Sequence, residues 1–106
     1  MDIVVIKQAQ RELKDAPREF IEDIYALFDD LSHGKLLGPP ISKPLSSIFK
    51  GLHELRLSGR SGEFRVFYLI RIGDAIYILH AHSKKTQKIE KKTIDLIHSR
   101  IKGIGL

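Results

Sequence analysis

Charged residues that alternate with apolar ones in two strand-like stretches are the first candidates for chemistry. Glu54 and Arg56 alternate with Leu55 and Leu57, and Arg65 interrupts the next apolar stretch. Because alternate side chains of a strand point to opposite faces, the three charged groups should project together from one face. A guanidinium in an apolar strand is costly unless it is paired or binds an anion. Two interpretations follow: an ion pair with Glu54, or an arginine that contacts a phosphate.

A second set of candidates lies at the end of the following strand-like stretch. His82 can transfer protons because imidazole titrates near neutrality, whereas His80, which follows a run of apolar residues, is predicted to be a hydrogen-bonded core histidine. Lys84 and Lys85, with Lys88 soon after, are placed to hold phosphate groups, with ordinary surface lysines as the competing interpretation. The two histidines lack a third ligand and precede lysines, so neither a metal site nor another cofactor is predicted.

Four further residues have weaker assignments. Tyr68 and Tyr77 are predicted to be core residues rather than platforms for a nucleobase, while His53 is a candidate at the rim of a site. Arg60, in a glycine-containing turn, joins the candidates for phosphate binding.

No glycine-rich phosphate loop, nucleophile elbow or zinc-protease motif is present. RNA cleavage needs fewer protein groups, because the ribose 2′-hydroxyl of the substrate is itself the nucleophile.

Composition and charge narrow the functional classes. The chain has 106 residues, no cysteine and 42% hydrophobic residues, so it is predicted to be one domain, residues 1–106, without disulfides or a membrane span. Its short apolar N-terminal run does not resemble a signal peptide, so the cytoplasm is the expected compartment. The net charge is −4 over residues 1–34, +4 over 35–83 and +5 over 84–106. A positive face that attracts polyanions such as nucleic acid is therefore predicted.

The elements that must position these residues follow from periodicity. A short strand over residues 2–7 precedes helices over 8–14 and from Pro17 to Gly34. Three prolines within residues 39–44 predict an irregular connector. Strands over 51–57, 64–72 and 75–83 and a helix after Lys88 complete a β-α-α-β-β-β-α order. The predicted fold is α+β, with a mostly antiparallel sheet and helices packed on one face.

Four strings of sequence resemble the RelE/ParE toxin superfamily, in its phage-derived HigB-like branch. They start at Leu36, Leu52, Phe64 and Leu79 and read LLGPPISKPL, LHELRL, FRVFY and LHAHSKKTQK. Their order and the length of the chain match the family, and the resemblance covers nearly the whole chain. It implies a RelE-like fold and a toxin of a type II toxin–antitoxin pair that cuts mRNA on the ribosome without a metal.

The resemblance also implies roles for individual residues. Arg65 matches the strand arginine that contacts the scissile phosphate, and Arg56 matches a basic residue on the neighbouring strand. Lys85, with Lys84 beside it, matches a late basic residue. His82, however, stands where this branch more often has an aromatic residue, and no tyrosine follows Tyr77, although some relatives have a catalytic tyrosine in the last helix. The general base therefore stays open among Glu54, His82 and His53.

The implied partners are mRNA on the ribosome and a cognate antitoxin, often a helix-turn-helix protein, in a hetero-oligomeric complex. An acidic or amphipathic antitoxin segment is expected to cover the positive face or the groove beside the last helix. Two alternatives stay open. ParE-like members of the superfamily inhibit DNA gyrase, and a toxin-derived chain without catalysis would serve as a binding or regulatory module.

Overall fold

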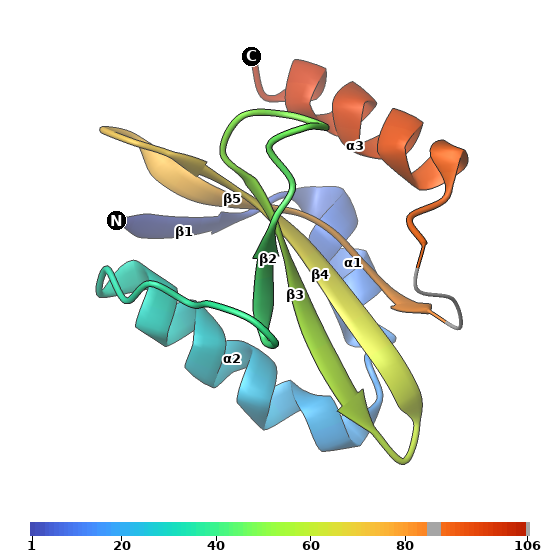
Figure 1. Ribbon diagram of the computed structural model, residues 1–106. Helices are drawn as coiled ribbons and strands as arrows, with labels where there is room; N and C mark the ends of the chain where they lie inside the picture. The colour runs from blue at the N-terminus through green and yellow to red at the C-terminus, as the bar shows by residue number, and fades with distance from the viewer. Residues whose placement is uncertain (85–87, 106) are drawn as a thin grey trace.

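The structure, a computed structural model, describes residues 1–84 and 88–105, and the elements appear along the chain as in Figure 1. They are β1 (Asp2–Val5), α1 (Lys7–Lys14), α2 (Arg18–Ser32), β2 (Ser42–Pro44), β3 (Leu52–Gly59), β4 (Gly62–Arg71), β5 (Ala75–Lys84) and α3 (Lys91–Gly103). None of the helices in the described ranges is long and apolar enough to cross a membrane. The α+β class and the mostly antiparallel sheet are as predicted.

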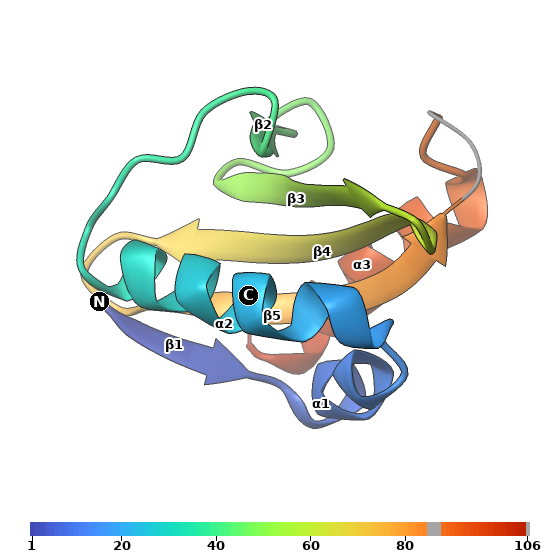
Figure 2. The ribbon, with the colours of Figure 1, turned by 90° about the horizontal axis from the view of Figure 1, so that it is seen from below.

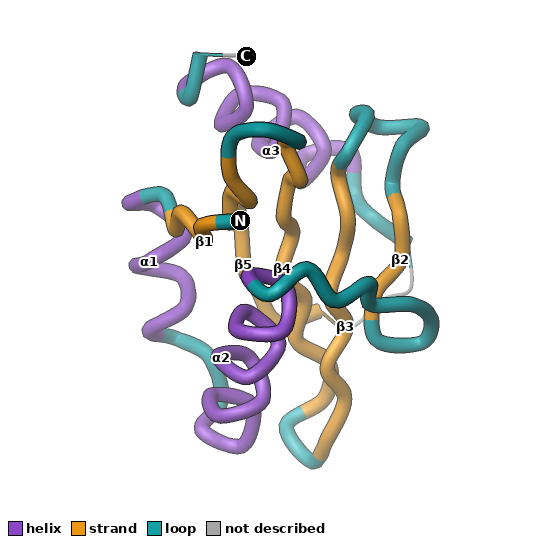
Figure 3. The backbone as a smooth tube through the Cα atoms, turned by 90° about the vertical axis from the view of Figure 1, so that its left-hand side faces the viewer, coloured by secondary structure: helices purple, strands orange, loops and turns teal. Residues whose placement is uncertain are grey.

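The five strands form one sheet in the order β1-β5-β4-β3-β2, which Figure 3 shows with the last four side by side. β1 pairs with β5 in parallel, and the other neighbours are antiparallel. The prediction that the proline-rich connector lacks regular structure is wrong for β2. Pro44 fits there because β2 is an edge strand, where a missing N–H group costs no hydrogen bond within the sheet.

Each face of the sheet buries its own apolar cluster. On β4, Phe64, Val66 and Tyr68 pack with α1 and α2, whereas Phe67 and Leu69 pack with α3. Figure 2 shows α2 and α3 on opposite sides of the sheet. Helices thus cover both faces rather than the one expected, because α3 carries its own apolar stripe. We call the side that α3 covers the α3 face.

The tip of the β3–β4 hairpin is tied to the start of α2. Glu19 accepts hydrogen bonds from the backbone N and the hydroxyl of Ser61, with donor–acceptor distances of 2.9 and 2.6 Å. A Cβ atom at position 59 would collide with the Glu19 carboxylate, so Gly59 is required for this close approach. The contact fixes the hairpin, and with it the charged residues on its two strands, relative to the helical layer.

A β-bulge in β5 decides which of its residues reach the α3 face. Phe67 pairs with His80 but Tyr68 pairs with Ile78, so Leu79 is an extra residue in the ladder. Ile78 packs with the α2 cluster, and a regular strand would have placed His80 on that same side. The bulge instead turns His80 and the alternate residues after it to the α3 face.

Candidate active site

Three neighbouring strands bring their charged residues into one row on the α3 face. Arg56 of β3 lies opposite Arg65 of β4, which lies opposite His82 of β5. Glu63 and Lys84 form the adjacent pair toward the hairpin tip. The Arg65 cluster, as we call it, consists of Glu54, Arg56, Glu63, Arg65, His82 and Lys84. The strand alternation correctly predicted that Glu54, Arg56 and Arg65 share a face.

Ion pairs connect four members of the Arg65 cluster. Arg65 Nη1 donates to Glu54 Oε2 at 3.0 Å and Arg65 Nη2 to Glu63 Oε2 at 2.9 Å, while Arg56 Nε donates to Glu54 Oε1 at 2.9 Å. The side chains of Arg65 and Glu54 are 0% exposed, whereas Arg56 and Glu63 keep 29% and 30% of their side-chain surface exposed. The structure therefore shows the first of the two interpretations of Arg65, the ion pair with Glu54. The guanidinium does not project freely into solvent as expected.

Three nitrogen atoms of the cluster are buried without a hydrogen-bond partner. They are Arg65 Nε, His82 Nε2 and Lys84 Nζ, and within residues 1–84 and 88–105 no other side-chain nitrogen or oxygen shares this condition. All three residues face the same side of two neighbouring strands. An unpaired buried polar atom costs about 1–3 kcal/mol, so three together form a costly arrangement that a bound anion would relieve.

Burial and neighbouring cations set the protonation of this cluster. Burial, together with the charges of His80 and Lys84, lowers the pKa of His82 to about 4, so its imidazole is neutral at pH 7. Burial and the charge of Arg65 also lower the pKa of Lys84, which makes its ammonium a stronger acid than that of an ordinary lysine. The hydrogen bond from Arg65 lowers the pKa of Glu63. The cluster thus combines a neutral imidazole with cations.

Other predicted site residues lie elsewhere. His53 stacks on Tyr68, with ring centroids 5.1 Å apart, on the face that packs with α2, so of the three candidates for the general base the structure separates His53 from Glu54 and His82. Arg60 is exposed in the β3–β4 turn, and Lys88 is exposed before α3. Lys85 lies outside the described residues. The alternation that placed Glu54 correctly would also have placed His53 on the opposite face.

A second ionic cluster, missed at the level of sequence, joins α1, β5 and α3. Glu12 Oε1 accepts from Arg100 Nη1 at 2.7 Å and lies 2.9 Å from His80 Nδ1, and Glu12 Oε2 accepts from Arg100 Nη2 at 2.9 Å. Burial raises the pKa of Glu12, but the hydrogen bonds from Arg100 and His80 outweigh it and the pKa is lowered. We call Glu12, His80 and Arg100 the Glu12 cluster. It bears out His80 as a hydrogen-bonded core residue.

One signal in the sequence pointed to the Glu12 cluster. Glu12 lies close to Ala9 and Leu13 on α1, both of which are buried. A carboxylate on the buried face of a helix requires a cationic or N–H partner. The identity of that partner, Arg100, could not follow from local pattern because it is 88 residues away.

A cleft lies between the two clusters. It has a volume of about 270 Å³ and is lined by Glu12, Asp15, Phe64 and the β5 residues 80–83. His82, a member of the Arg65 cluster, therefore also lines an open cleft. No group of three or more His, Asp or Glu residues within the described ranges is arranged to hold a metal ion.

The arrangement can stabilise a polyanion and move protons. Arginine and lysine nitrogens that lack partners offer hydrogen bonds to the oxygens of a phosphate or a similar oxyanion. The neutral His82 can accept a proton, and Lys84 can donate one. These groups are held on a rigid sheet rather than on loops, which favours a fixed geometry around the bound anion.

Comparison with known proteins adds a family and a fold. The model of a family described as phage-derived protein Gp49-like matches residues 11–102. An Escherichia coli toxin RelE variant with two arginines replaced by alanine, in the free state, shares 12% sequence identity and a TM-score of 0.54, covering 97% of this chain and 96% of that chain. The isolated E. coli RelE toxin shares 14% identity and a TM-score of 0.48, with 97% of each chain covered. No curated protein matches the sequence significantly.

Proposed function

This chain belongs to the family of phage-derived Gp49-like proteins and has the RelE fold, and from this premise we propose that it is the toxin of a type II toxin–antitoxin pair that cleaves mRNA on the ribosome. The observation that carries the proposal is the set of three unpaired buried nitrogens beside Arg56 on the α3 face. A phosphodiester of RNA supplies acceptor oxygens for Arg65 Nε and Lys84 Nζ, and its adjacent 2′-hydroxyl supplies a donor for His82. The proposed partners are an mRNA in the ribosome and a cognate antitoxin.

The proposed reaction uses the 2′-hydroxyl of the substrate. His82, neutral at pH 7, accepts the proton of this hydroxyl while its oxygen forms a bond to the adjacent phosphorus. The bond from phosphorus to the 5′-oxygen of the next nucleotide breaks, and Lys84 gives that oxygen a proton. The products are a 2′,3′-cyclic phosphate and a 5′-hydroxyl. Arg65 and Arg56 stabilise the additional negative charge on the phosphate oxygens.

The ion pairs of Arg65 require one rearrangement before a phosphate binds its Nη atoms. Glu63 is the more exposed of the two carboxylates that Arg65 holds, so it is the one that a substrate phosphate would displace. Glu54 stays in place, because its other oxygen is held by Arg56. The Nε atom of Arg65 has no carboxylate to exchange, but it is buried, so a phosphate reaches it only when the side chains around it move.

The double pairing of Arg65 supports a second candidate, a binding module without catalysis. In that case the cluster serves only to hold β3, β4 and β5 together, and phosphate never replaces Glu63. The two candidates differ in what the removal of Lys84 does, because Lys84 Nζ has no hydrogen-bond partner to lose but is essential to the proposed reaction.

Induction in a bacterial host tests the proposal. The wild-type chain and the variants Arg56→Ala and Lys84→Met are expressed from a tightly controlled promoter, and growth, translation and mRNA ends are followed. We expect growth arrest with new 5′-hydroxyl mRNA ends for the wild type and neither for Lys84→Met. Growth arrest with intact mRNA and stalled replication would instead indicate gyrase inhibition. Identical phenotypes for all three chains would indicate the module without catalysis.

A further inference from the structure

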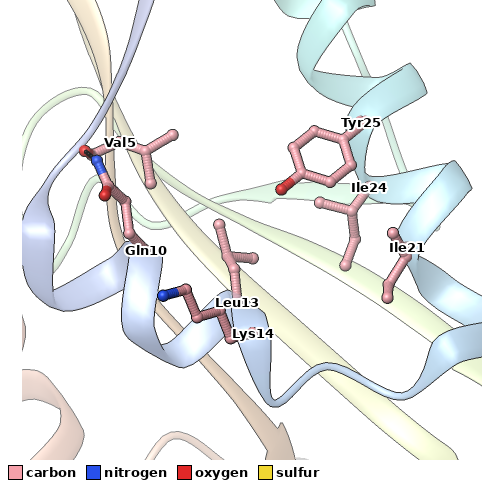
Figure 4. A pocket seen from close by; sticks show the side chains of 7 residues that line it. All are labelled: Val5, Gln10, Leu13, Lys14, Ile21, Ile24 and Tyr25. Carbon is pink, nitrogen blue, oxygen red and sulfur yellow. Dashed lines mark hydrogen bonds between the residues drawn. The ribbon is translucent and has the colours of Figure 1, made fainter.

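An apolar groove lies between β1 and α1 on one side and α2 on the other (Figure 4). Its volume is about 480 Å³, and its apolar lining comes from Val5, Leu13, Ile21, Ile24 and Tyr25. These residues belong to the side of the sheet that packs with α2, so the groove is separated by the sheet from the Arg65 cluster. Nothing in the proposed reaction uses it.

The floor and the rim of the groove differ in exposure. Leu13 and Ile24, which form the floor, are 9% and 2% exposed, whereas Ile21 and Tyr25 on the rim are 37% and 59% exposed. Tyr25 packs edge-to-face on Phe28, with ring centroids 5.9 Å apart, so its ring is supported in this exposed position. Supported aromatic and aliphatic side chains on the rim of an apolar groove are typical of protein interaction sites.

The groove continues toward the C-terminal end of α2, where the N-terminus of the chain lies. A second hollow of about 480 Å³, lined by Met1, Ile3, Phe28 and others, shares Tyr25 with the first. Tyr25 therefore lies in the middle of one extended depression. Its length along α2 suits an elongated occupant rather than a small compact ligand.

The two helical walls carry opposite charges. On α1, the exposed Lys14 lines the groove. On α2, the exposed acidic residues Glu22 and Asp29 flank Tyr25 at three and four residues' distance. An occupant of the extended groove therefore meets the ammonium of Lys14 on the α1 wall and the carboxylate of Asp29 on the α2 wall.

We propose that the groove binds an amphipathic helix of the antitoxin, with acidic residues along the flank that faces α1 and lysines or arginines along the flank that faces α2. This inference rests on the proposed function for the identity of the partner. An elongated groove with an apolar floor and walls formed by two helices suits an amphipathic helix. An added strand is disfavoured because β1 has only four residues and its Val5 carbonyl already accepts a hydrogen bond from Gln10 Nε2 at 2.9 Å. A helix bound there leaves the Arg65 cluster uncovered.

The test measures the affinity between the purified chain and the antitoxin encoded by the neighbouring gene, by isothermal titration calorimetry. The Lys84→Met background allows the chain to be produced without growth arrest. We expect the double variant Ile21→Ala/Tyr25→Ala to weaken binding about 100-fold, because rim aromatic residues concentrate binding energy. Lys14→Glu should weaken binding roughly tenfold, and more strongly at low salt than at high salt.

Two matched controls separate the groove from general surface effects. Ile41→Ala removes an aliphatic residue that is 44% exposed outside the groove, and Lys92→Glu reverses an exposed charge at the start of α3. Both should leave the affinity within about twofold of the parent, as expected for surface positions outside an interface. Equal affinities for the groove variants and the controls would overturn the proposal, as would the absence of binding by the parent chain.

A second readout distinguishes failure of this proposal from failure of the proposed function. In the chain with Lys84 intact, the groove variants should still arrest growth and cut mRNA, and co-expressed antitoxin should no longer rescue them. Rescue equal to that of the parent overturns the groove but leaves the toxin function standing. Absence of growth arrest and of mRNA cleavage in the parent itself contradicts the proposed function.

Discussion

The two ionic clusters beside β5 differ in how completely their polar atoms are satisfied. In the Glu12 cluster both carboxylate oxygens accept hydrogen bonds, and Arg100 Nη1 also donates to the carbonyl of Leu79 at 2.8 Å. In the Arg65 cluster the carboxylates are also paired, but nitrogens of Arg65, His82 and Lys84 are buried without partners. Both clusters bury arginine and glutamate in the same small domain, so burial of charge alone does not distinguish them.

We infer from this difference that the Glu12 cluster contributes to stability and the Arg65 cluster to the proposed function. The Glu12 cluster joins α1 to β5 and α3, which lie far from α1 in the sequence, and its hydrogen bonds are completed within the protein. The Arg65 cluster leaves hydrogen-bonding capacity unused at a cost in folding free energy. Sites that bind charged ligands commonly have such unmet capacity, because the ligand completes it.

The largest expected effect comes from Lys84→Met, which replaces an unpaired buried ammonium by an apolar side chain of similar length. Cleavage of mRNA should fall about 1,000-fold through loss of the proton donor and a phosphate contact. The free energy of unfolding should rise by about 1 kcal/mol, because a buried cation without a partner is removed. Denaturant unfolding and quantitative mapping of RNA ends measure the two quantities. A variant that lost both activity and stability would contradict the contrast between the clusters.

The opposite pattern is expected for Glu12→Gln. The free energy of unfolding should fall by about 2–3 kcal/mol, because Arg100 and His80 lose the carboxylate that joins them. Cleavage per folded molecule should change by less than about threefold, since Glu12 does not touch the proposed substrate phosphate. Urea unfolding monitored by circular dichroism gives the stability. Glu22→Gln, a matched change at an exposed position on α2, should shift the stability by less than about 0.5 kcal/mol.

Stability should also depend on pH through His82. Its pKa is lowered to about 4 in the folded chain, whereas the ordinary value in an unfolded chain is about 6.5. Between these values the unfolded chain binds more protons, so the folded state loses stability as the pH falls from about 6.5 to 4, by at most about 3 kcal/mol. His82→Phe should flatten this dependence, which thermal unfolding at a series of pH values measures. His80, whose pKa burial also lowers, contributes a residual slope of the same sign. Parallel curves for the variant and the wild type would show that His82 is not buried in the neutral form.

The smallest effect is expected for Glu63→Gln. Glu63 holds Arg65 Nη2 and is the carboxylate that a substrate phosphate would displace. Removing its charge should increase the affinity for a short RNA oligonucleotide by roughly three- to tenfold, because less competition and less repulsion oppose the phosphate. Glu54→Gln, in contrast, should weaken binding, because Glu54 orients both arginines. Fluorescence anisotropy with a labelled non-cleavable oligonucleotide measures both affinities, and equal values for the two variants would exclude separate roles for these carboxylates.

The sequence predicted those parts of the site that depend on regular local structure. Alternation along β3 and β4 was sufficient to place Glu54, Arg56 and Arg65 on one face. The sequence named His82 and Lys84 as candidates for the same site, but strand alternation alone could not place them on that face, because the bulge at Leu79 has no clear local signature. The pairing of Glu12 with Arg100 depends on the packing of helices at opposite ends of the chain. The strand β2 was missed because proline content argues against strands, although an edge position tolerates it.

The most direct test of the central claim is cleavage of a defined mRNA on purified, programmed ribosomes by the wild type, Lys84→Met and Glu12→Gln. The claim is that the unpaired nitrogens of the Arg65 cluster form the site where RNA is cut. The account predicts products with a 2′,3′-cyclic phosphate and a 5′-hydroxyl from the wild type and Glu12→Gln, and intact mRNA with the folded Lys84→Met chain. Equal cleavage by Lys84→Met and the wild type, or no cleavage by any of the three, would contradict it.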